Sequence, residues 1–468
     1  MDDDLLFSGA AALAGLTRSG DLSARDLVEA CLARVDATNE RLNAFTNVMR
    51  EEALVEADAR DAARSRGDEL GPLHGVPVGI KEEIDVAGQV TTFGGRANTT
   101  PARADAEVVT RLRQAGAVVV GKTAMPEFGQ WPFTESVAFG MTRNPWDTTR
   151  SPGGSSGGTA AAVASGMVPF GIGGDGGGSI RIPSACCGLF GLKPQRGRVS
   201  SDPHGHLWWA LGTAGPLTRS VLDSALVYDV IHGALPGDRF RAGTQHAPFV
   251  DAVDAPMKPL RIAWSTKAVT LGVKPAPEHV EAVRSTVSAL ADLGHRVVEV
   301  DPGYPDPTAA FVPQFFAGVA SEAQTVEHPE RLERRTRETL RLGAWVRPRV
   351  VEWAMRQGEG VAEKANRIFG TYDLLLTPVI GPRPPEVGVL EGVGTLRAAL
   401  ASTPMIAYTA LWNVTGNPAA SVPAGFAEDG LPLAVQLVGR PHDEATILTV
   451  SAQLERARPW ADAKPGLG

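Results

Sequence analysis

This sequence has very little cysteine and no segment long and apolar enough to cross a membrane. Its 468 residues include only Cys31, Cys186 and Cys187, and an odd number with one adjacent pair is a poor basis for a disulfide framework. No apolar run approaches the roughly 18–20 residues of a membrane span. The acidic N-terminus also lacks the basic and apolar pattern of a signal peptide. We therefore expect a soluble, cytoplasmic protein with no membrane partner.

An excess of positive charge is also missing. The formal net charge is −8, and no stripe of lysine and arginine runs along any segment. This argues against nucleic acid as a partner, because nucleic-acid binding depends on neutralising phosphates. Hydrophobic residues make up 43% and charged residues 21% of the chain, the ordinary balance of a folded globular protein. We expect a monomer or homodimer that acts on a small molecule.

Helix-like and strand-like segments alternate along most of the chain. Ser23 and Asp26 suggest a capped helix start, and a second helix over 51–66 should stop at Gly67. Further helices are expected over 105–115, 158–165, 278–293 and 445–456, and a helix-rich segment over 308–357. Strands are expected over 76–80, 118–120, 168–172, 260–264, 295–300, 373–377 and 433–438. Such alternation is typical of a layered α/β domain.

Two glycine patterns are similar to nucleotide-binding motifs, but their surroundings argue against a cofactor. Residues 116–123 have phosphate-loop spacing, yet the apolar strand occupies the variable positions instead of preceding the first glycine. Gly171, Gly173 and Gly176 match the dinucleotide fingerprint, but no acidic residue follows about 20 positions later. We expect neither a cofactor nor a metal ion.

A third pattern offers an alternative mechanism. Residues 153–157, Gly-Gly-Ser-Ser-Gly, match the G-x-S-x-G elbow of α/β-hydrolases. Ser155 would then be the nucleophile of a Ser-His-Asp esterase, which needs a downstream histidine and an acidic partner. Eight histidines follow Ser155, most of them in segments with the pattern of surface loops or helices. This alternative stays open.

Three segments together resemble the amidase signature family. They read Gly75-Val-Pro-Val-Gly-Ile-Lys81, then Ser151-Pro-Gly-Gly-Ser155-Ser-Gly-Gly158, then Gly177-Gly-Ser179-Ile-Arg-Ile-Pro183. The 24-residue spacing between Ser155 and Ser179 is also that of the family, and similar stretches extend from Met125 to Pro423. The resemblance implies one large α/β/α domain over residues 1–468, with a mixed, mostly parallel central sheet covered by helices. An N-terminal helical segment would cover about 1–70 and a Gly/Ser-rich catalytic core about 71–220.

The resemblance also implies a reaction and the residues that perform it. Ser179 would attack the acyl carbon of an amide, Ser155 in a cis peptide would take its proton, and Lys81 would deprotonate Ser155. Serine needs such a base to become a good nucleophile. Lysine can serve only when neutral, which burial next to an apolar strand favours. Water would then hydrolyse the acyl-enzyme.

The glycines around Ser179 have an implied role of their own. Without side chains, they let backbone N–H groups approach a substrate oxygen closely. The expected oxyanion hole consists of Gly176, Gly177, Gly178 and Ser179. The expected supporting residues, which hold the loops without taking part in the chemistry, are Ser156, Asp175 and Arg181, the last two as an ion pair.

Four positions depart from the family pattern. Gly174 stands where a hydroxyl residue is common, and Gly176 where a larger residue is common. Glu82 and Glu83 replace the usual Asp-Asn after the lysine. A carboxylate facing Lys81 would favour its charged form and oppose catalysis. We expect both glutamates to point away.

The substrate is less well defined by the sequence. Gly129, Gln130 and Trp131 are expected to line the site by resemblance. An aromatic pocket is expected from Trp131, Trp208, Trp209, Phe316 and Trp412, and core packing is the alternative for each of them. These residues favour hydrophobic acyl or aryl substrates such as anilides and aryl carbamates (urethanes), and esters as well.

Two further function classes stay open. The glutaminase subunit of a transfer-RNA amidotransferase shares the fold and triad, but its loop usually resembles Ala-Met-Gly-Ser-Ser-Thr-Glu. Here residues 129–135 read Gly-Gln-Trp-Pro-Phe-Thr-Glu, with bulky aromatics. A catalytically silent binding protein is the other class, and the intact set of Lys81, Ser155 and Ser179 argues against it.

Overall fold

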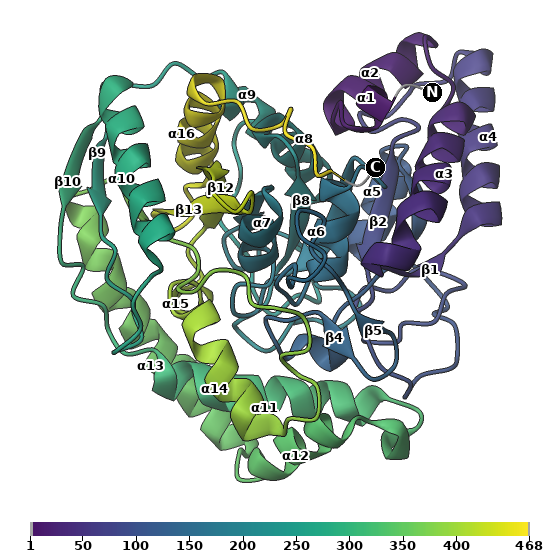
Figure 1. Ribbon diagram of the computed structural model, residues 1–468. Coiled ribbons are helices and arrows are strands. Elements are labelled where there is room, and N and C mark those ends of the chain that lie inside the picture. Colours follow the sequence, from purple (N-terminus) through teal and green to yellow (C-terminus); the bar gives the residue numbers. More distant parts are fainter. Residues whose placement is uncertain (1–2, 467–468) are drawn as a thin grey trace.

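The computed structural model describes residues 3–466 and is organised around one large sheet (Figure 1). Eleven strands of the described chain form it. In spatial order they are β1 (Phe45–Val48), β3 (Val118–Thr123), β2 (Pro77–Lys81), β6 (Phe170–Gly174), β8 (Ala214–Thr218), β7 (Phe190–Lys193), β12 (Ala419–Phe426), β13 (Pro432–Gly439), β11 (Leu374–Pro378), β9 (Arg261–Trp264) and β10 (Arg296–Glu299). A separate small ribbon pairs β4 (Glu135–Ser136) with β5 (Gly140–Met141).

Strand directions in the large sheet are mixed, as expected, but parallel pairs do not dominate. Four of its ten pairings are parallel, within β3-β2-β6 and within β11-β9-β10. The other six are antiparallel and include the whole centre of the sheet. The expectation of a mostly parallel sheet is therefore wrong. No helix separates β12 from β13, and a short connection of this kind joins antiparallel neighbours.

Helices cover both faces of the sheet (Figure 1). One face packs against α3 (Ala24–Leu42), α4 (Arg50–Arg66), α6 (Gly157–Ala164), α7 (Arg181–Cys187) and α14 (Thr395–Ile406). The other packs against α2 (Ala10–Ser19), α5 (Glu107–Gln114), α8 (Val221–Ile231), α9 (Phe249–Val253), α10 (Pro277–Asp292) and α16 (Glu444–Ala457). The remaining helices are α1 (Asp3–Leu6), α11 (Thr308–Thr325), α12 (Arg334–Leu342), α13 (Pro348–Ala365) and α15 (Ala410–Thr415). Short 3₁₀ turns are η1 (Glu127–Gly129), η2 (Pro329–Arg331) and η3 (Asn366–Gly370).

The expected helices and strands are present within a few residues of their predicted ends. Ser23 caps α3 by accepting a hydrogen bond from the Asp26 N–H at 2.9 Å, and α4 ends at Gly67 in the left-handed conformation. Strands β1, β4, β5, β7, β8 and β12 were not predicted. A single domain over 1–468, with divisions near 70 and 220, stays a prediction, and residues 1–2 and 467–468 lie outside the described chain.

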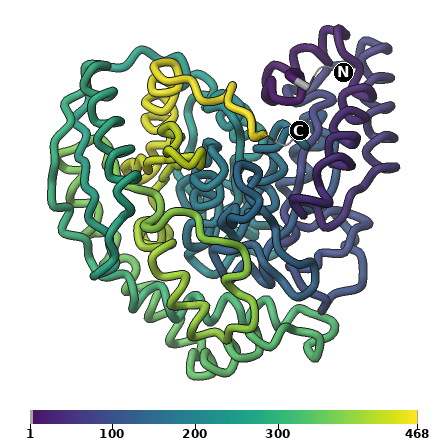
Figure 2. Tube along the Cα trace, in the orientation of Figure 1, coloured from purple at the N-terminus to yellow at the C-terminus, as the bar shows by residue number. Residues whose placement is uncertain are grey.

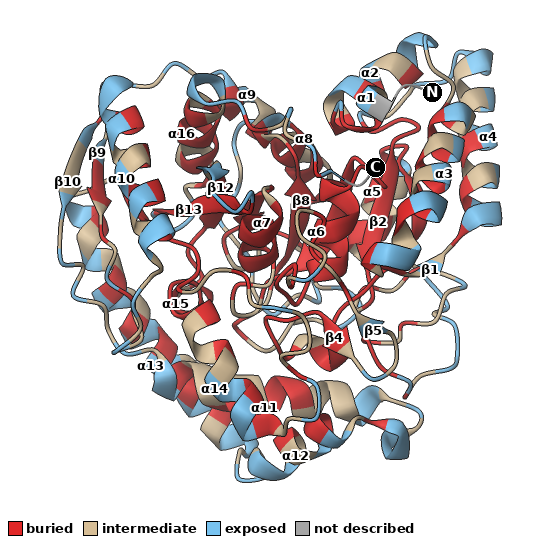
Figure 3. Ribbon diagram, in the orientation of Figure 1, coloured by how far each residue is buried: buried red, intermediate tan, exposed pale blue. Residues whose placement is uncertain are grey.

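The glycine- and alanine-rich segment between residues 151 and 191 forms the most deeply buried part of the fold (Figure 3). All eight residues of α6 are buried. A methyl group on Gly157 would overlap Thr134, and one on Gly158 would overlap the backbone of Ala124. Small side chains are needed there because α6 lies directly against its neighbours. The segment is an ordered core and not a linker.

The first and last segments of the described chain lie close together (Figure 2), where Lys464 forms an ion pair with Asp4. Within residues 3–466, no helix is both long and apolar enough to span a bilayer.

Candidate active site

Lys81 ends strand β2 and directs its side chain into the molecule. Ile80 packs into the core on one face of the sheet, so Lys81 points to the opposite face, where α6 begins. The Lys81 side chain is only 1% exposed, and its Nζ lies 2.9 Å from Ser155 Oγ. The fold thus brings together a lysine and a serine that are 74 residues apart.

Ser155 sits in a tight turn just before α6. The Gly154–Ser155 peptide bond is cis, as the resemblance implied. Thr134 Oγ1 fixes this turn, because it donates to the Gly153 carbonyl at 2.9 Å and accepts from the Gly157 N–H at 3.0 Å. One hydroxyl from outside the segment therefore holds both sides of the turn.

Ser156 links this turn to the loop that carries Ser179. Its Oγ is within hydrogen-bonding distance of the Gly174 carbonyl, at 3.2 Å, and of the Gly174 N–H, at 3.3 Å. Its own N–H donates to the Ser179 carbonyl at 3.3 Å. These contacts place Ser156 between the two serine-bearing segments, and its supporting role stays a prediction.

Asp175 and Arg181 form a buried ion pair, named the clamp, next to the loop that carries Ser179. They form a two-pronged ion pair with both distances at 3.0 Å, and both side chains are fully buried. Arg181 also donates to Gln436 Oε1 at 2.8 Å and to Asn413 Oδ1 at 2.7 Å. Burial alone would raise the pKa of Asp175, but the charge of Arg181 and its hydrogen bonds hold that pKa well below its usual value.

The backbone N–H groups of this loop divide into two sets. Gly178 donates to Asp175 Oδ1 at 2.7 Å, so its N–H is directed at the clamp and away from a substrate. By contrast, within residues 3–466 nothing accepts a hydrogen bond from the N–H of Gly176, Gly177 or Ser179. The N–H groups of these three residues are therefore available to a further acceptor, whereas the N–H of Gly178 is used within the loop.

Lys81, Ser155 and Ser179 open onto the same narrow hollow, of about 30 Å³. Gly129 closes one side of it, because a methyl group on Gly129 would lie 3.1 Å from Ser155 Oγ. Gly129 also adopts a left-handed conformation, with φ of 64°, which favours glycine.

His204 lines this hollow too, which bears on the alternative mechanism. Its Nε2 lies 4.0 Å from Asp85 Oδ2. Yet in the described part of the chain, no histidine hydrogen-bonds to Ser155 Oγ or to Ser179 Oγ. The partner of Ser155 is Lys81, so the geometry favours a lysine base over a Ser-His-Asp arrangement.

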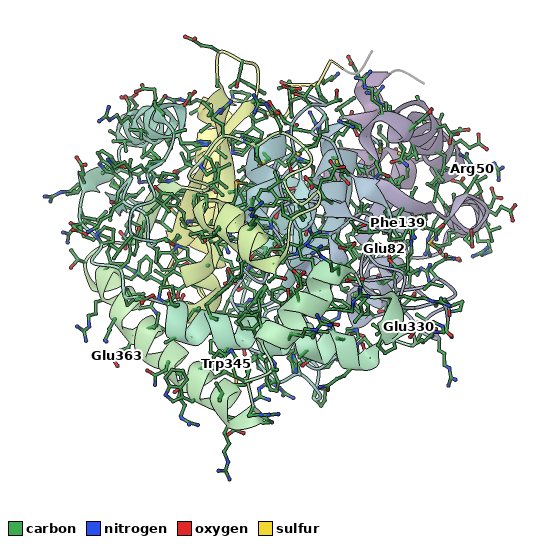
Figure 4. The ribbon with its side chains drawn as sticks, turned by 60° about the horizontal axis from the view of Figure 1, so that its bottom comes forward. Arg50, Glu82, Phe139, Glu330, Trp345 and Glu363 are labelled. Carbon is green, nitrogen blue, oxygen red and sulfur yellow. The ribbon has the colours of Figure 1, made fainter. Side chains whose placement is uncertain are left out.

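The two glutamates after Lys81 behave differently, and one expectation about them is wrong. Glu82 points away, as expected, and accepts hydrogen bonds from Thr46 and Thr92. Its position in the fold is labelled in Figure 4. Glu83, however, faces Lys81, with Oε1 3.0 Å from Nζ. The chain turns after β2, so consecutive side chains diverge and one of them returns to the hollow.

A much wider cavity, of about 380 Å³, opens on the other side of Ser179. Its walls are mainly aromatic and aliphatic, and they come from the η1 loop, the 208 region, α11, α14 and α15. The residues that matter here are Gly129, Gln130, Trp131, Gly177, Ser179, Trp208, Phe311, Phe315, Phe316, Ile406 and Leu411.

Three of the five aromatics proposed for a pocket line this cavity, namely Trp131, Trp208 and Phe316. The other two do not. Trp209 stacks on His206 outside it, and Trp412 is buried in the core behind it. The cavity also includes Phe311 and Phe315 of α11, which were not proposed for the pocket. Their helical spacing of four residues was the available signal.

Gln130 reaches the cavity wall but uses its amide within the protein. Its Nε2 donates to the Glu127 carbonyl at 3.0 Å and to Thr336 Oγ1 at 2.9 Å. Burial raises the pKa of the neighbouring Glu127 carboxyl to about 7. Gln130 therefore ties η1 to α12.

Several residues that contact the Ser179 loop come from the last quarter of the chain and were not predicted. Thr409 Oγ1 donates to the Gly177 carbonyl at 2.6 Å, and Asn413 Nδ2 donates to the Asp175 carbonyl at 2.9 Å. Nothing in their local sequence marks them apart from polar residues within apolar surroundings. In the part of the chain that the structure describes, no group of three or more His, Cys, Asp or Glu side chains is placed to hold a metal ion.

Comparison with known proteins places this geometry in a family. The Amidase family profile matches residues 26–448. AmiB2 of Mycobacterium tuberculosis, whose assignment as an amidase is itself provisional, is 46% identical over 99% of both chains. The matching component of the glutamyl-tRNA(Gln) amidotransferase of Chloroflexus aggregans is 37% identical over 96% of both.

Solved structures agree with the sequence relatives. A 6-aminohexanoate cyclic dimer hydrolase bound to its substrate superposes with a TM-score of 0.92 at 34% identity, over 99% of both chains. A bacterial aryl acylamidase of the amidase signature family superposes with a TM-score of 0.85 at 27% identity, over 97% of both.

Proposed function

This chain belongs to the amidase signature family and is an amidohydrolase acting on carbon–nitrogen bonds other than peptide bonds, and from that premise we propose that Ser179, Ser155 and Lys81 are its catalytic residues. The observation that carries the proposal is the 2.9 Å contact between Lys81 Nζ and Ser155 Oγ in a hollow that also contains Ser179. A buried lysine in contact with a hydroxyl is a base suited to activate serine.

The first half of the reaction forms an ester with the enzyme. Ser179 Oγ attacks the acyl carbon and gives its proton to Ser155, which passes its own proton to neutral Lys81. A hydroxyl can do this because it both donates and accepts. The same path returns the proton to the leaving amine when the carbon–nitrogen bond breaks. Water then attacks the ester, again losing its proton through Ser155, and releases the acid and free Ser179.

The negative oxygen of the tetrahedral intermediate needs donors. We assign them to the N–H groups of Gly176, Gly177 and Ser179, which have no acceptor among the described residues. Loss of one such donor typically costs about 3–4 kcal/mol of transition-state stabilisation. Gly178 supports the loop through its bond to Asp175.

The wide cavity supports a preference for hydrophobic acyl or aryl groups. It adjoins Ser179, and its walls include Trp131, Phe311 and Phe315. Apolar groups gain roughly 25 cal/mol per Å² on leaving water for such a surface. We propose anilides, other aryl amides and aryl carbamates as substrates, with esters cleaved as well because they pass through the same acyl-enzyme.

The test is a panel of chromogenic amides, carbamates and esters with short and long acyl groups, assayed with wild type and Ser179→Ala. Hydrophobic substrates should be preferred, and the variant should lose all turnover. A fluorophosphonate probe should label the wild type at Ser179 alone. Full activity in Ser179→Ala, or labelling at Ser155, would overturn the assignment of the nucleophile.

A second candidate is the glutaminase component of a transfer-RNA amidotransferase, favoured by the 37% identity to the Chloroflexus protein. Trp131 and the apolar cavity count against it, because the side chain of glutamine is polar. Ammonia release from glutamine that requires a partner protein would favour this candidate over the first.

We propose that the enzyme works in the cytoplasm as a monomer or homodimer. Its Cys31, Cys186 and Cys187 are free and buried, which supports a reducing compartment. Size-exclusion chromatography with light scattering tests the oligomeric state.

A further inference from the structure

The carboxylate of Glu83 lies in the catalytic hollow, although the mechanism above gives it no role. Lys81 Nζ is 3.0 Å from Glu83 Oε1 and 2.9 Å from Ser155 Oγ. We propose that Glu83 is a positioning residue, which holds Lys81 against Ser155 and sets the pH at which Lys81 can accept a proton. It fits there because residue 174 is glycine. This inference rests on the proposed role of Lys81 as the base.

Two glycines leave the space that Glu83 fills. A methyl group on Gly174 would overlap Glu83 Oε1 and lie 3.8 Å from Lys81 Nζ. A methyl group on Gly129 would lie 3.5 Å from Glu83 Oε2. Gly174 is an ordinary strand residue paired with Ala214, so its backbone conformation does not itself require glycine. The close approach of the carboxylate is the reason for a glycine there.

The neighbouring Glu82 shows what a purely structural glutamate looks like in this fold. Both of its oxygens are used by threonines, Oε1 by Thr46 and Oε2 by Thr92. Glu83 has no such anchor among the described residues, and its ion-pair partner is Lys81. Its side chain is 18% exposed, against 1% for Lys81, so Glu83 is the more accessible member of the pair.

Other titratable groups line the same hollow as Lys81, namely Asp175, His204 and Glu322 of α11. The charge of Asp175 is matched by Arg181. Burial, and then the charges of Glu83 and Asp85, raise the pKa of Glu322 to about 8, so Glu322 is mostly uncharged at neutral pH. Glu83 is therefore the anion in direct contact with the base.

This contact has a measurable consequence in the pH profile. An adjacent carboxylate favours the charged form of lysine, whereas catalysis needs the neutral form. Glu83→Gln keeps the side-chain length and removes the charge. We expect the acidic limb of kcat/KM to move to lower pH by about 1–3 units. A side chain that only packed would leave the limb in place, and an unmoved limb overturns the inference.

Two matched variants separate the effect of the contact between Glu83 and Lys81 from the effect of any nearby negative charge. Glu82→Gln removes a carboxylate one residue earlier, and Glu322→Gln removes the other glutamate of the hollow. Both should leave the acidic limb within about 0.3 units of wild type, because the Glu82 carboxylate points away from Lys81 and Glu322 is mostly uncharged at neutral pH. A limb that moves equally in all three variants would contradict a specific role for Glu83.

A double-mutant cycle tests whether Gly174 makes room for the Glu83 carboxylate. Gly174→Ala should displace the carboxylate and move the limb in the same direction as Glu83→Gln. In a Glu83→Ala background, Gly174→Ala should change kcat/KM less than twofold, because no carboxylate remains to be displaced. Additive losses would show that the two positions act independently, which would contradict the inference that Gly174 makes room for Glu83.

Labelling with a fluorophosphonate keeps the two proposals apart. The probe is applied to wild type and to every variant. The melting temperature of each protein is measured to check that it is folded. Wild type that fails to label at Ser179 rejects the proposed function. Normal labelling together with an unmoved limb in Glu83→Gln rejects only the role of Glu83.

Discussion

Ser179 lines two hollows that differ in size and in the side chains around them. The narrow one is about 30 Å³ and contains Lys81, Glu83 and Ser155, whereas the wide one is about 380 Å³ and is mostly aromatic and aliphatic. The loop before Ser179 forms the partition, because Gly176 lines the narrow hollow and Gly177 lines the wide cavity.

The difference separates the chemistry from the choice of substrate. Proton transfer needs polar groups held at fixed distances, and the narrow hollow provides them without involving the substrate's apolar part. Selection among substrates needs a surface on which the burial of apolar groups is favourable in free energy. Changes in the narrow hollow should therefore lower kcat for every substrate alike, and changes in the wide cavity should alter the ranking of substrates.

Apart from the loss of the Ser179 nucleophile itself, the largest effect should come from removing the base. Lys81→Met keeps an apolar side chain of similar length but cannot take a proton. We expect kcat to fall by about 10³-fold for short and long acyl amides alike, since general base catalysis contributes about 10²–10⁴-fold. Steady-state kinetics on both substrate classes is the measurement. A loss confined to hydrophobic substrates would break the separation between the two hollows.

The partition between the hollows should be the next most sensitive part. Asp175→Ala leaves the fully buried Arg181 without its counter-charge, and breaking a buried ion pair in this way costs about 3–5 kcal/mol. Denaturant unfolding should show this loss, together with lower activity on all substrates. Asp301→Ala is the control, because Asp301 pairs with Lys267 in the open and its removal should leave stability unchanged. Equal stability of the two variants would mean that the clamp does not hold the loop.

The site was more predictable from the sequence than the sheet was. Lys81, Ser155 and Ser179 lie in short glycine-rich motifs. In such motifs the local sequence indicates the backbone conformation, because only glycine permits such close approaches. The centre of the sheet depends on β7, β8 and β12, which carry few β-branched residues and no clear alternation. Their pairing is decided by long-range packing, so the proportion of antiparallel strands was misjudged.

Glu83 shows a different limit of sequence reasoning. Whether it faced Lys81 depended on the path of the chain after β2, and residue type alone does not determine that path. Gly174 was noted as a departure, but its link to Glu83 appears only when the two segments meet in space. Likewise, Trp209 and Trp412 match Trp131 in residue type and differ only in where the fold puts them.

A change in the wide cavity should affect substrates unequally. The ring of Phe311 approaches the loop, since a methyl group on Gly177 would lie 3.4 Å from its Cζ. Phe311→Ala should lower kcat/KM about 10-fold for aryl or long acyl amides and less than twofold for acetyl amides, because only the larger groups reach the ring. Trp209→Ala, which removes an aromatic outside the cavity, should leave the ratio unchanged. A uniform loss in Phe311→Ala would place that ring in the catalytic machinery instead.

The smallest effect is the most direct measure of what the cavity contributes. Along a series of straight-chain acyl anilides, each added methylene that enters the cavity should gain about 0.8 kcal/mol, which is about fourfold in kcat/KM. The gain should stop once the cavity is full, and Phe311→Ala should move that point to a longer chain because it enlarges the space. The same series measured with Lys81→Met should keep its slope at a far lower rate, since the base does not contact the acyl chain. A flat series in the wild type would mean that the apolar walls do not receive the acyl group, and the cavity would then have to hold the leaving group.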